Sequence, residues 1–91
     1  MQIGDAFALA RNIERRNRLS IEDMLGRWRM LTMREQEVAK LVASDMLNKQ
    51  IAIDLDIQEH TVKIHRSNAC RKLGVRSALE LHGFLKDIGA I

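Results

Sequence analysis

Apolar residues recur every three or four positions along most of the last two thirds of the chain, and this spacing predicts amphipathic α-helices. The first of these helices begins after Thr32 and ends near Asp45, because Thr32 and Glu35 have the spacing of a capping box. A short helix over 48–55 follows, and the break at Asp56 leaves room only for a sharp turn into the next helix. The pattern therefore predicts two helices that pack against each other across a tight turn.

A longer helix is predicted from about Gln58, and it ends at Gly74, a residue type that commonly follows a helix C-terminus. Ser77 and Glu80 repeat the capping-box spacing and start a fourth helix. Four helices with one tight turn predict an all-α helix-turn-helix domain over 31–91.

The first third of the chain is also rich in helix-forming residues, and we expect residues 1–30 to form a helical linker or N-terminal helix. Asp5 is placed to cap its start, and Glu14 and Arg18 stand in the favourable order for an i,i+4 ion pair. Ser20 is also placed to start a second helix. One long helix and two shorter helices both fit this pattern.

The helix expected after the tight turn divides into two faces when its residues are placed 100° apart. One face is apolar and predicts a core stripe: Val62, Ala69 and Leu73. His65 falls beside this stripe. The opposite face mixes basic groups, a small hydroxyl and one isolated apolar residue: His60, Lys63, Ile64, Ser67 and Arg71. Arg66 and Lys72 flank this face from either side.

Charge is distributed unevenly along the chain, although the formal net charge is only +3. Residues 32–59 carry three basic and six acidic groups, whereas residues 60–91 carry six basic and two acidic groups. No acidic residue stands between Glu59 and Glu80. A solvated helix face usually interleaves acids with bases, so this stretch predicts a localised anion-binding surface, to which Lys49 adds. On charge alone, a solvated helix face is the alternative.

The residue types on this surface suit the major groove of DNA. Lys and Arg bind phosphates or the guanine edge, Ser binds either, and an apolar side chain such as Ile64 contacts a thymine methyl group. The helix is too rarely apolar on its exposed side to lie in a membrane interface. Aromatic residues make up only 3% of the chain, which disfavours RNA binding by base stacking.

Composition narrows the remaining classes of function. The only cysteine, Cys70, excludes a disulfide within one chain, and no apolar run reaches the roughly 18 residues that span a bilayer. The N-terminal stretch lacks the charge order of a secretory signal, so we expect a cytoplasmic, nucleoid-associated protein without a membrane partner. His60 and His65 lie on different faces, so no metal is expected. Without a nucleophile–base pair or phosphate-binding glycine loop, the sequence predicts neither an enzyme nor a cofactor.

The segments LTMREQEVAKLVAS (31–44) and NKQIAIDLDIQEHTVKIHRSNACRKLGVRSALEL (48–81) resemble the LuxR-type helix-turn-helix domain. They are particularly similar to the effector domains of the FixJ/NarL group of response regulators. The resemblance covers roughly two thirds of the chain. The matching positions are spread over all four expected helices: Leu31, Thr32, Arg34, Glu35, Glu37, Val38, Asn48, Lys49, Ile51, Ala52, Leu55, Ile57, Thr61, Val62, Lys63, His65, Asn68, Arg71, Lys72, Leu73, Gly74, Val75 and Ser77.

This resemblance implies a bacterial transcription regulator that binds double-stranded DNA sequence-specifically, as a response-regulator effector domain or as a regulator without a receiver domain. The base-reading positions of the family map onto the third helix: His60, Lys63, Ile64 and Ser67. Contacts with the DNA backbone are implied for five further residues: Lys49, Thr61, Arg66, Arg71 and Lys72. The last helix pairs two subunits in the family, which implies a homodimer on DNA through Leu81, Phe84, Leu85 and Ile88.

The sequence departs from the family pattern at three helix ends. Asp45 stands where the family usually has Gly, and Asp tolerates the left-handed conformation better than most residues. Leu47 and Gln58 stand where Ser or Thr usually caps a helix, and we expect Asn48 to replace the first of these caps after a one-residue shift. These weaker caps slightly favour a second hypothesis, a protein-interaction module that pairs with full-length LuxR-type regulators and modulates them. A receiver domain and RNA polymerase are further candidate partners.

Overall fold

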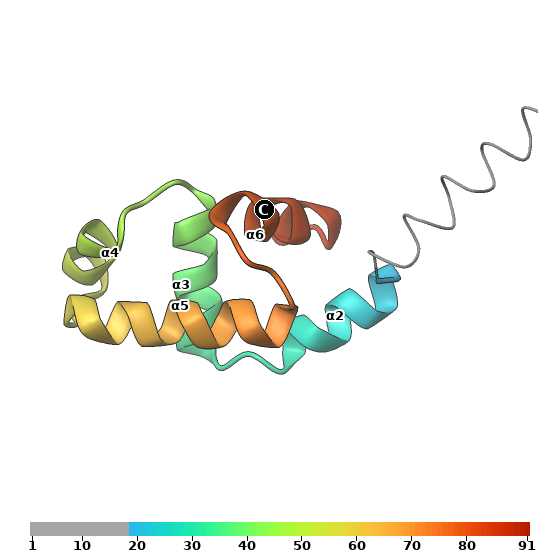
Figure 1. The fold of residues 1–91 in the computed structure, drawn as a ribbon, viewed down its shortest axis with the longest axis horizontal. Helices are drawn as coiled ribbons and strands as arrows, with labels where there is room; N and C mark the ends of the chain where they lie inside the picture. The colour runs from blue at the N-terminus through green and yellow to red at the C-terminus, as the bar shows by residue number, and fades with distance from the viewer. Residues whose placement is uncertain (1–18) are drawn as a thin grey trace, which may run out of the picture.

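The computed structural model describes residues 19–91, and within this range the chain forms only α-helices (Figure 1). The prediction of an all-α helix-turn-helix fold is therefore confirmed. The expected Asp5 cap and the expected pair of Glu14 and Arg18 lie outside the described residues. The helices are α2 (Ile21–Arg29), α3 (Met33–Ala43), α4 (Asn48–Leu55), α5 (Glu59–Leu73) and α6 (Ala78–Asp87).

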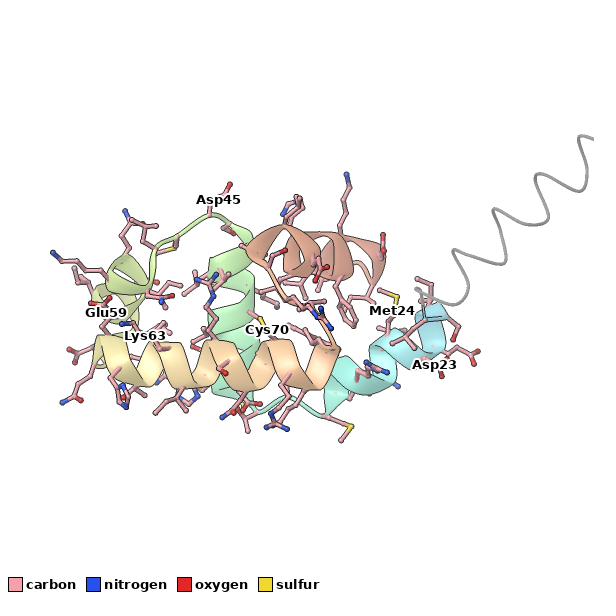
Figure 2. The ribbon with its side chains drawn as sticks, viewed as in Figure 1. Asp23, Met24, Asp45, Glu59, Lys63 and Cys70 are labelled. Carbon is pink, nitrogen blue, oxygen red and sulfur yellow. The ribbon has the colours of Figure 1, made fainter. Side chains whose placement is uncertain are left out.

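The start of α2 is fixed by a side-chain cap. The hydroxyl of Ser20 accepts a hydrogen bond from the backbone N–H of Asp23 at 3.1 Å, which confirms that a helix begins there. Met24, on the buried side of α2, belongs to the main core (Figure 2). The core of the domain therefore includes a helix that precedes residue 31.

The capping box predicted for α3 is confirmed. Thr32 Oγ1 accepts from the N–H of Glu35 at 3.1 Å, and Glu35 Oε1 accepts from the N–H of Thr32 at 2.9 Å. Two backbone donors that a helix start leaves without partners are thus satisfied. After α3, Asp45 adopts a φ of 65°, so it takes the left-handed conformation for which the family usually supplies Gly.

The start of α4 differs from the prediction. Leu47 occupies the N-cap position, and the carboxamide of Gln50 accepts a hydrogen bond from the Leu47 N–H at 2.9 Å. Asn48 lies inside the helix, and its Oδ1 atom accepts instead from the side chain of Arg66. The expected transfer of the cap to Asn48 is therefore wrong, because its side-chain oxygen is already engaged between helices.

The turn into α5 and the turn out of it both depend on left-handed residues. Asp56, with a φ of 54°, ends α4, and Gly74, with a φ of 74°, ends α5. Ser77 caps α6 by accepting from the N–H of Glu80 at 3.1 Å, as predicted. The second half of that capping box is absent, because the Glu80 carboxylate accepts from the N–H of Arg76 instead.

The described helices share one core, and α3 and α5 each pack against three of the others. Helix α5 packs against α3, α4 and α2, while α6 packs against α3 (Figure 1). The buried apolar residues come from every described helix and from the α2–α3 connection: Met24, Leu31, Val38, Ala39, Val42, Ala43, Ile51, Ala52, Val62, Ala69, Leu73, Leu81, Phe84 and Leu85. Their burial holds α5 in place and leaves its other face exposed.

The apolar stripe of α6 faces this core. Leu81, Phe84 and Leu85 are buried, and Ile88 packs against them from a half-buried position. From the family resemblance, these four residues were expected at a contact between two chains. The structure places them inside one chain, because α6 has a single apolar stripe and the core uses it.

Candidate nucleic-acid interface

The two faces predicted for α5 are present in the structure. The core stripe of Val62, Ala69 and Leu73 is buried. Every residue assigned to the opposite face is exposed: His60, Lys63, Ile64, Ser67 and Arg71. This exposed face of α5 brings together all four residues expected to read bases. On this face, the apolar side chain of Ile64 is 47% exposed, on the opposite side of α5 from the core stripe.

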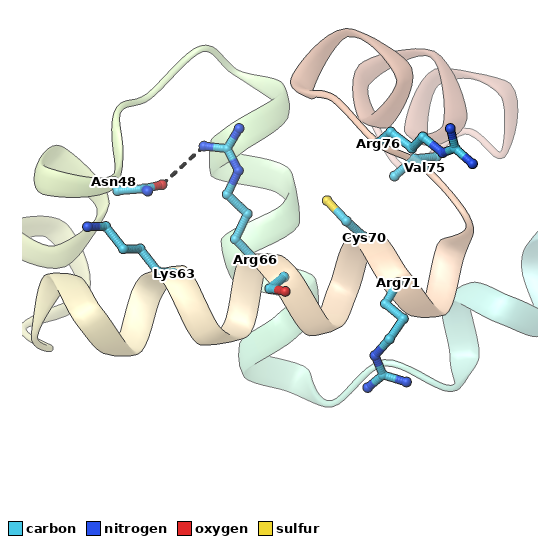
Figure 3. Close-up of a pocket in the computed structure, with 8 residues that line it drawn as sticks. Asn48, Lys63, Arg66, Cys70, Arg71, Val75 and Arg76 are labelled. Carbon is cyan, nitrogen blue, oxygen red and sulfur yellow. Dashed lines mark hydrogen bonds between the residues drawn. The ribbon is translucent and has the colours of Figure 1, made fainter.

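The residues expected at the DNA backbone lie in three different environments. Lys49 is exposed in the first turn of α4, and Thr61 is half-buried near the start of α5. Arg66 is half-buried and turns toward α4, where its Nη1 atom donates to Asn48 Oδ1 at 3.1 Å (Figure 3). Lys72 points toward the start of α3, so these side chains do not form one continuous row.

Lys72 is engaged in an ion pair with a buried carboxylate. Its Nζ atom lies 2.7 Å from Glu35 Oε1, the same oxygen that accepts from the Thr32 N–H. Burial by itself raises the pKa of Glu35, but the hydrogen bonds from Lys72 and Thr32 and the nearby charges of Lys72 and His65 outweigh it. The pKa of Glu35 therefore lies below its ordinary value. The positive charge of Lys72 is paired with this carboxylate inside the fold.

A hollow runs along one side of the exposed face of α5 (Figure 3). Its volume is about 440 Å³, and it lies between α5, the start of α4 and the α5–α6 connection. We call it the basic hollow, and its lining is Asn48, Lys63, Arg66, Ser67, Cys70, Arg71, Val75 and Arg76. Four of these residues are Lys or Arg, and none is acidic.

Sequence reasoning missed Arg76 and Asn48 as parts of this surface. Arg76 lies between two helices, where no periodicity assigns a direction to a side chain. Asn48 was expected to cap α4, and its contact with Arg66 depends on the angle between α4 and α5. The only sequence signal that includes Arg76 is the excess of basic residues after residue 60.

Cys70 is a half-buried thiol in the floor of the basic hollow. Burial raises the pKa of Cys70, and this effect exceeds the opposing influence of the positive charge of Arg66. The side chain is therefore a neutral thiol near pH 7, as expected for a semi-buried structural cysteine.

Within residues 19–91, no group of three or more His, Cys, Asp or Glu side chains is placed to hold a metal ion. None of the helices described here is long and apolar enough to cross a membrane.

Comparison with known proteins identifies the family. Residues 29–84 match the family described as bacterial regulatory proteins, luxR family. The chain belongs to this family. The LuxR-type resemblance is thereby confirmed, and the chain is a helix-turn-helix domain of DNA-binding transcription regulation.

Several curated bacterial proteins are similar to the chain. The response regulator protein TmoT of Ectopseudomonas mendocina is 41% identical over 75% of this chain and 31% of its own length. Nodulation protein W of Bradyrhizobium diazoefficiens is 34% identical over 93% of this chain and 39% of its own length. The spore germination protein GerE of Bacillus subtilis is 51% identical over 52% of this chain and 64% of its own length. The chain thus spans about a third of the length of relatives such as TmoT, and no solved structure matches it.

Proposed function

We propose that the chain binds double-stranded DNA sequence-specifically with α5 in the major groove, as a regulator of bacterial transcription. The observation that carries this proposal is the exposed face of α5, where Lys63, Ile64 and Ser67 stand opposite the buried core stripe. An exposed face of this kind contributes little to the packing of the domain. Its residue types are suited to a partner that presents negative charge and base edges.

Within this proposal, the side chains divide into two roles. The base-reading group is His60, Lys63, Ile64 and Ser67, because these side chains lie on the exposed face of α5. Lys49, Thr61, Arg66 and Arg71 contact phosphates on either side of the groove. Lys72 contributes less to DNA binding than its charge indicates, because Glu35 already holds its ammonium group.

We further propose that two chains bind together on paired half-sites about one helical turn apart. The support is an exposed apolar residue on α6: Leu79 is 81% exposed, while the inward stripe of the same helix is buried. A second chain would therefore contact α6 on its outer face. The similarity to TmoT, which is named a response regulator, supports a role for residues 1–30, of which α2 packs into the core of the domain, as the connection to a receiver domain. In this proposal the protein is not an enzyme and acts in the cytoplasm at the nucleoid.

The decisive experiment is selection of bound duplexes from a random DNA pool by the 91-residue chain, with its oligomeric state measured on the recovered DNA. We expect an enriched inverted repeat bound by two chains, with an affinity that falls steeply as salt rises. A recovered pool without any enriched motif contradicts sequence-specific binding. That result, together with capture of a full-length LuxR-type regulator, would favour the protein-interaction module instead.

Substitutions on the selected duplex test the two roles. Lys63→Ala and Ser67→Ala should relax base preference at one position each, whereas Lys49→Ala should weaken all sequences about equally. The measurement is the affinity for the selected duplex and for single-base variants of it. Unchanged base preference in Lys63→Ala would show that another face of α5 enters the groove.

A further inference from the structure

The two sides of the exposed face of α5 carry unequal charge. On one side, the ammonium of Lys72 is bound to Glu35 at 2.7 Å, and Thr61 and His65 are half-buried. On the other side lies the basic hollow, whose lining adds Arg66 and Arg76 to Lys63 and Arg71 of the exposed face. A polyanion that lies along α5 therefore meets more positive charge on this side than on the other.

The guanidinium groups that line the hollow come from different parts of the fold. Arg66 extends from α5 and is oriented by its hydrogen bond to Asn48, which uses only one of its five N–H donors (Figure 3). Arg76 comes from the α5–α6 connection and is exposed. The backbone at Arg76 is tied to α6, because its N–H donates to the Glu80 carboxylate. Both guanidinium groups are thus attached to ordered backbone beside the exposed face of α5.

The chemistry of the hollow matches a phosphodiester. A guanidinium presents paired N–H donors that fit the two free oxygens of a phosphate group, and the hydroxyl of Ser67 adds one further donor. The hollow opens beside the face that we place in the major groove, where the backbone of a DNA strand borders the groove. None of its lining residues is acidic, and the Glu80 carboxylate, whose charge reaches Cys70, is hydrogen-bonded to the Arg76 N–H.

We propose that the basic hollow holds a backbone phosphate of one DNA strand between Arg66 and Arg76, so that the chain binds the two strands beside the groove unequally. This inference rests on the proposed function, and it adds Arg76 as a DNA-contacting residue from outside the helix-turn-helix. Arg76 then fixes the position of α5 along the groove without reading a base.

The test uses the duplex selected above, prepared as a series in which one phosphate at a time, on either strand, is replaced by an uncharged methylphosphonate. Binding is measured for the wild-type chain, for Arg76→Gln and for Lys40→Gln, a matched control that removes an exposed cation of α3 outside the hollow. Equal thermal unfolding midpoints establish that the variants are folded. We expect one position on one strand where neutralisation weakens wild-type binding roughly tenfold but leaves the affinity of Arg76→Gln unchanged.

The salt dependence gives an independent readout. For Arg76→Gln, the slope of log K against log salt should be smaller in magnitude by about 1, and Lys40→Gln should keep the wild-type slope. If Arg76→Gln behaves like Lys40→Gln, the hollow does not hold a phosphate, while sequence-specific binding by the wild-type chain still stands. Altered base preference in Arg76→Gln would also overturn the inference, because it would place Arg76 at a base edge. Absence of any wild-type binding refutes both the proposed function and this inference.

Discussion

The carboxylate of Glu35 joins the start of α3 to α5. It accepts from the Thr32 N–H at 2.9 Å and from Lys72 at 2.7 Å, and the residue is only 4% exposed. Its role in the capping box was predictable, because that role depends on residues three positions apart. Its bond to Lys72 was not predictable, since 37 residues separate the two partners. A residue that caps one helix thereby also orients the helix proposed to contact DNA.

Glu35→Gln should lower the free energy of unfolding by about 1–3 kcal/mol, because the amide keeps an acceptor for Thr32 but loses the charge that Lys72 requires. The matched control is Glu37→Gln, which breaks an exposed pair with Arg34 and should cost about 0–0.5 kcal/mol. Urea denaturation at pH 7 measures both values. Equal losses for the two variants would show that the Glu35–Lys72 pair contributes no more to the free energy of unfolding than an exposed pair does.

The same carboxylate predicts a pH dependence. Because the pKa of Glu35 is lowered in the folded state, its contribution to stability is present above the ordinary value of 4.5 and is lost as pH falls through the lower folded value. Wild-type stability should therefore fall more steeply below pH 4.5 than that of Glu35→Gln. Urea denaturation between pH 7 and pH 3 compares the two chains, and parallel curves would contradict this assignment.

At the scale of the elements, the starts of α4 and α5 are the least well capped. Neither Leu47 nor Gln58 makes a side-chain cap hydrogen bond, whereas Ser20, Thr32 and Ser77 each do. The sequence identified both weak caps, because capping depends on the residue type at a single position. The structure adds that Gln50 compensates at α4 through its bond to the Leu47 N–H.

Leu47→Ser should raise the free energy of unfolding by about 1 kcal/mol, because a hydroxyl at the N-cap satisfies a second backbone donor of α4. Little apolar burial is lost, since Leu47 is 67% exposed. Ser77→Ala, which removes an existing cap, should lower stability by a similar amount. Urea denaturation of the three chains measures these changes, and a loss of stability in Leu47→Ser would show that the leucine side chain has a packing role.

The link between α2 and α5 depends on Gly74. Arg27 of α2 donates to the carbonyl of Leu73 at 3.4 Å, and a Cβ atom at position 74 would lie 2.6 Å from Arg27 Nη1. Gly74 is therefore favoured by its φ of 74°, and a Cβ atom at this position would also displace the end of the Arg27 side chain. The hydrogen bond from Arg27 joins the C-terminal end of α5 to α2.

Gly74→Ala should destabilise the chain by about 1–2 kcal/mol through left-handed strain and displacement of Arg27. Gly89→Ala is the matched control, because Gly89 has the same φ of 74° but nothing within 4 Å of an added Cβ. In an Arg27→Ala background, the cost of Gly74→Ala should shrink toward that of the control. Thermal or urea unfolding measures all four variants, and an unchanged cost in that background would leave backbone strain as the whole explanation.

At the scale of the whole molecule, the proposed pairing of two chains needs a surface that the fold leaves exposed. The sequence predicted pairing through the apolar stripe of α6, but the core of a single chain already uses that stripe. A helix with one apolar stripe has only its outer face left for a second chain, and on α6 that face carries Leu79. Periodicity located the stripe correctly, yet it does not state which surface the stripe covers.

Leu79→Ser should therefore weaken pairing of two chains on the selected DNA while changing monomer stability by no more than about 0.5 kcal/mol. Leu81→Ala should instead cost about 2–5 kcal/mol of stability, because Leu81 is fully buried. Analytical ultracentrifugation on a duplex with two half-sites measures pairing, and urea denaturation measures stability. Unimpaired pairing in Leu79→Ser would place the contact between chains elsewhere.

Local features of this protein were determined by the sequence itself: the helices after residue 31, the caps of α3 and α6, the tight turn at Asp56 and the division of α5 into a core stripe and an exposed face. These depend on residue type and on spacings of a few positions, which a linear pattern records. The tertiary structure alone decided which charges remain available. It bound Lys72 to Glu35, turned Arg66 toward Asn48 and brought Arg76 beside α5. Each of these depends on distances between segments that are remote in the chain, and those distances exist only once the helices pack.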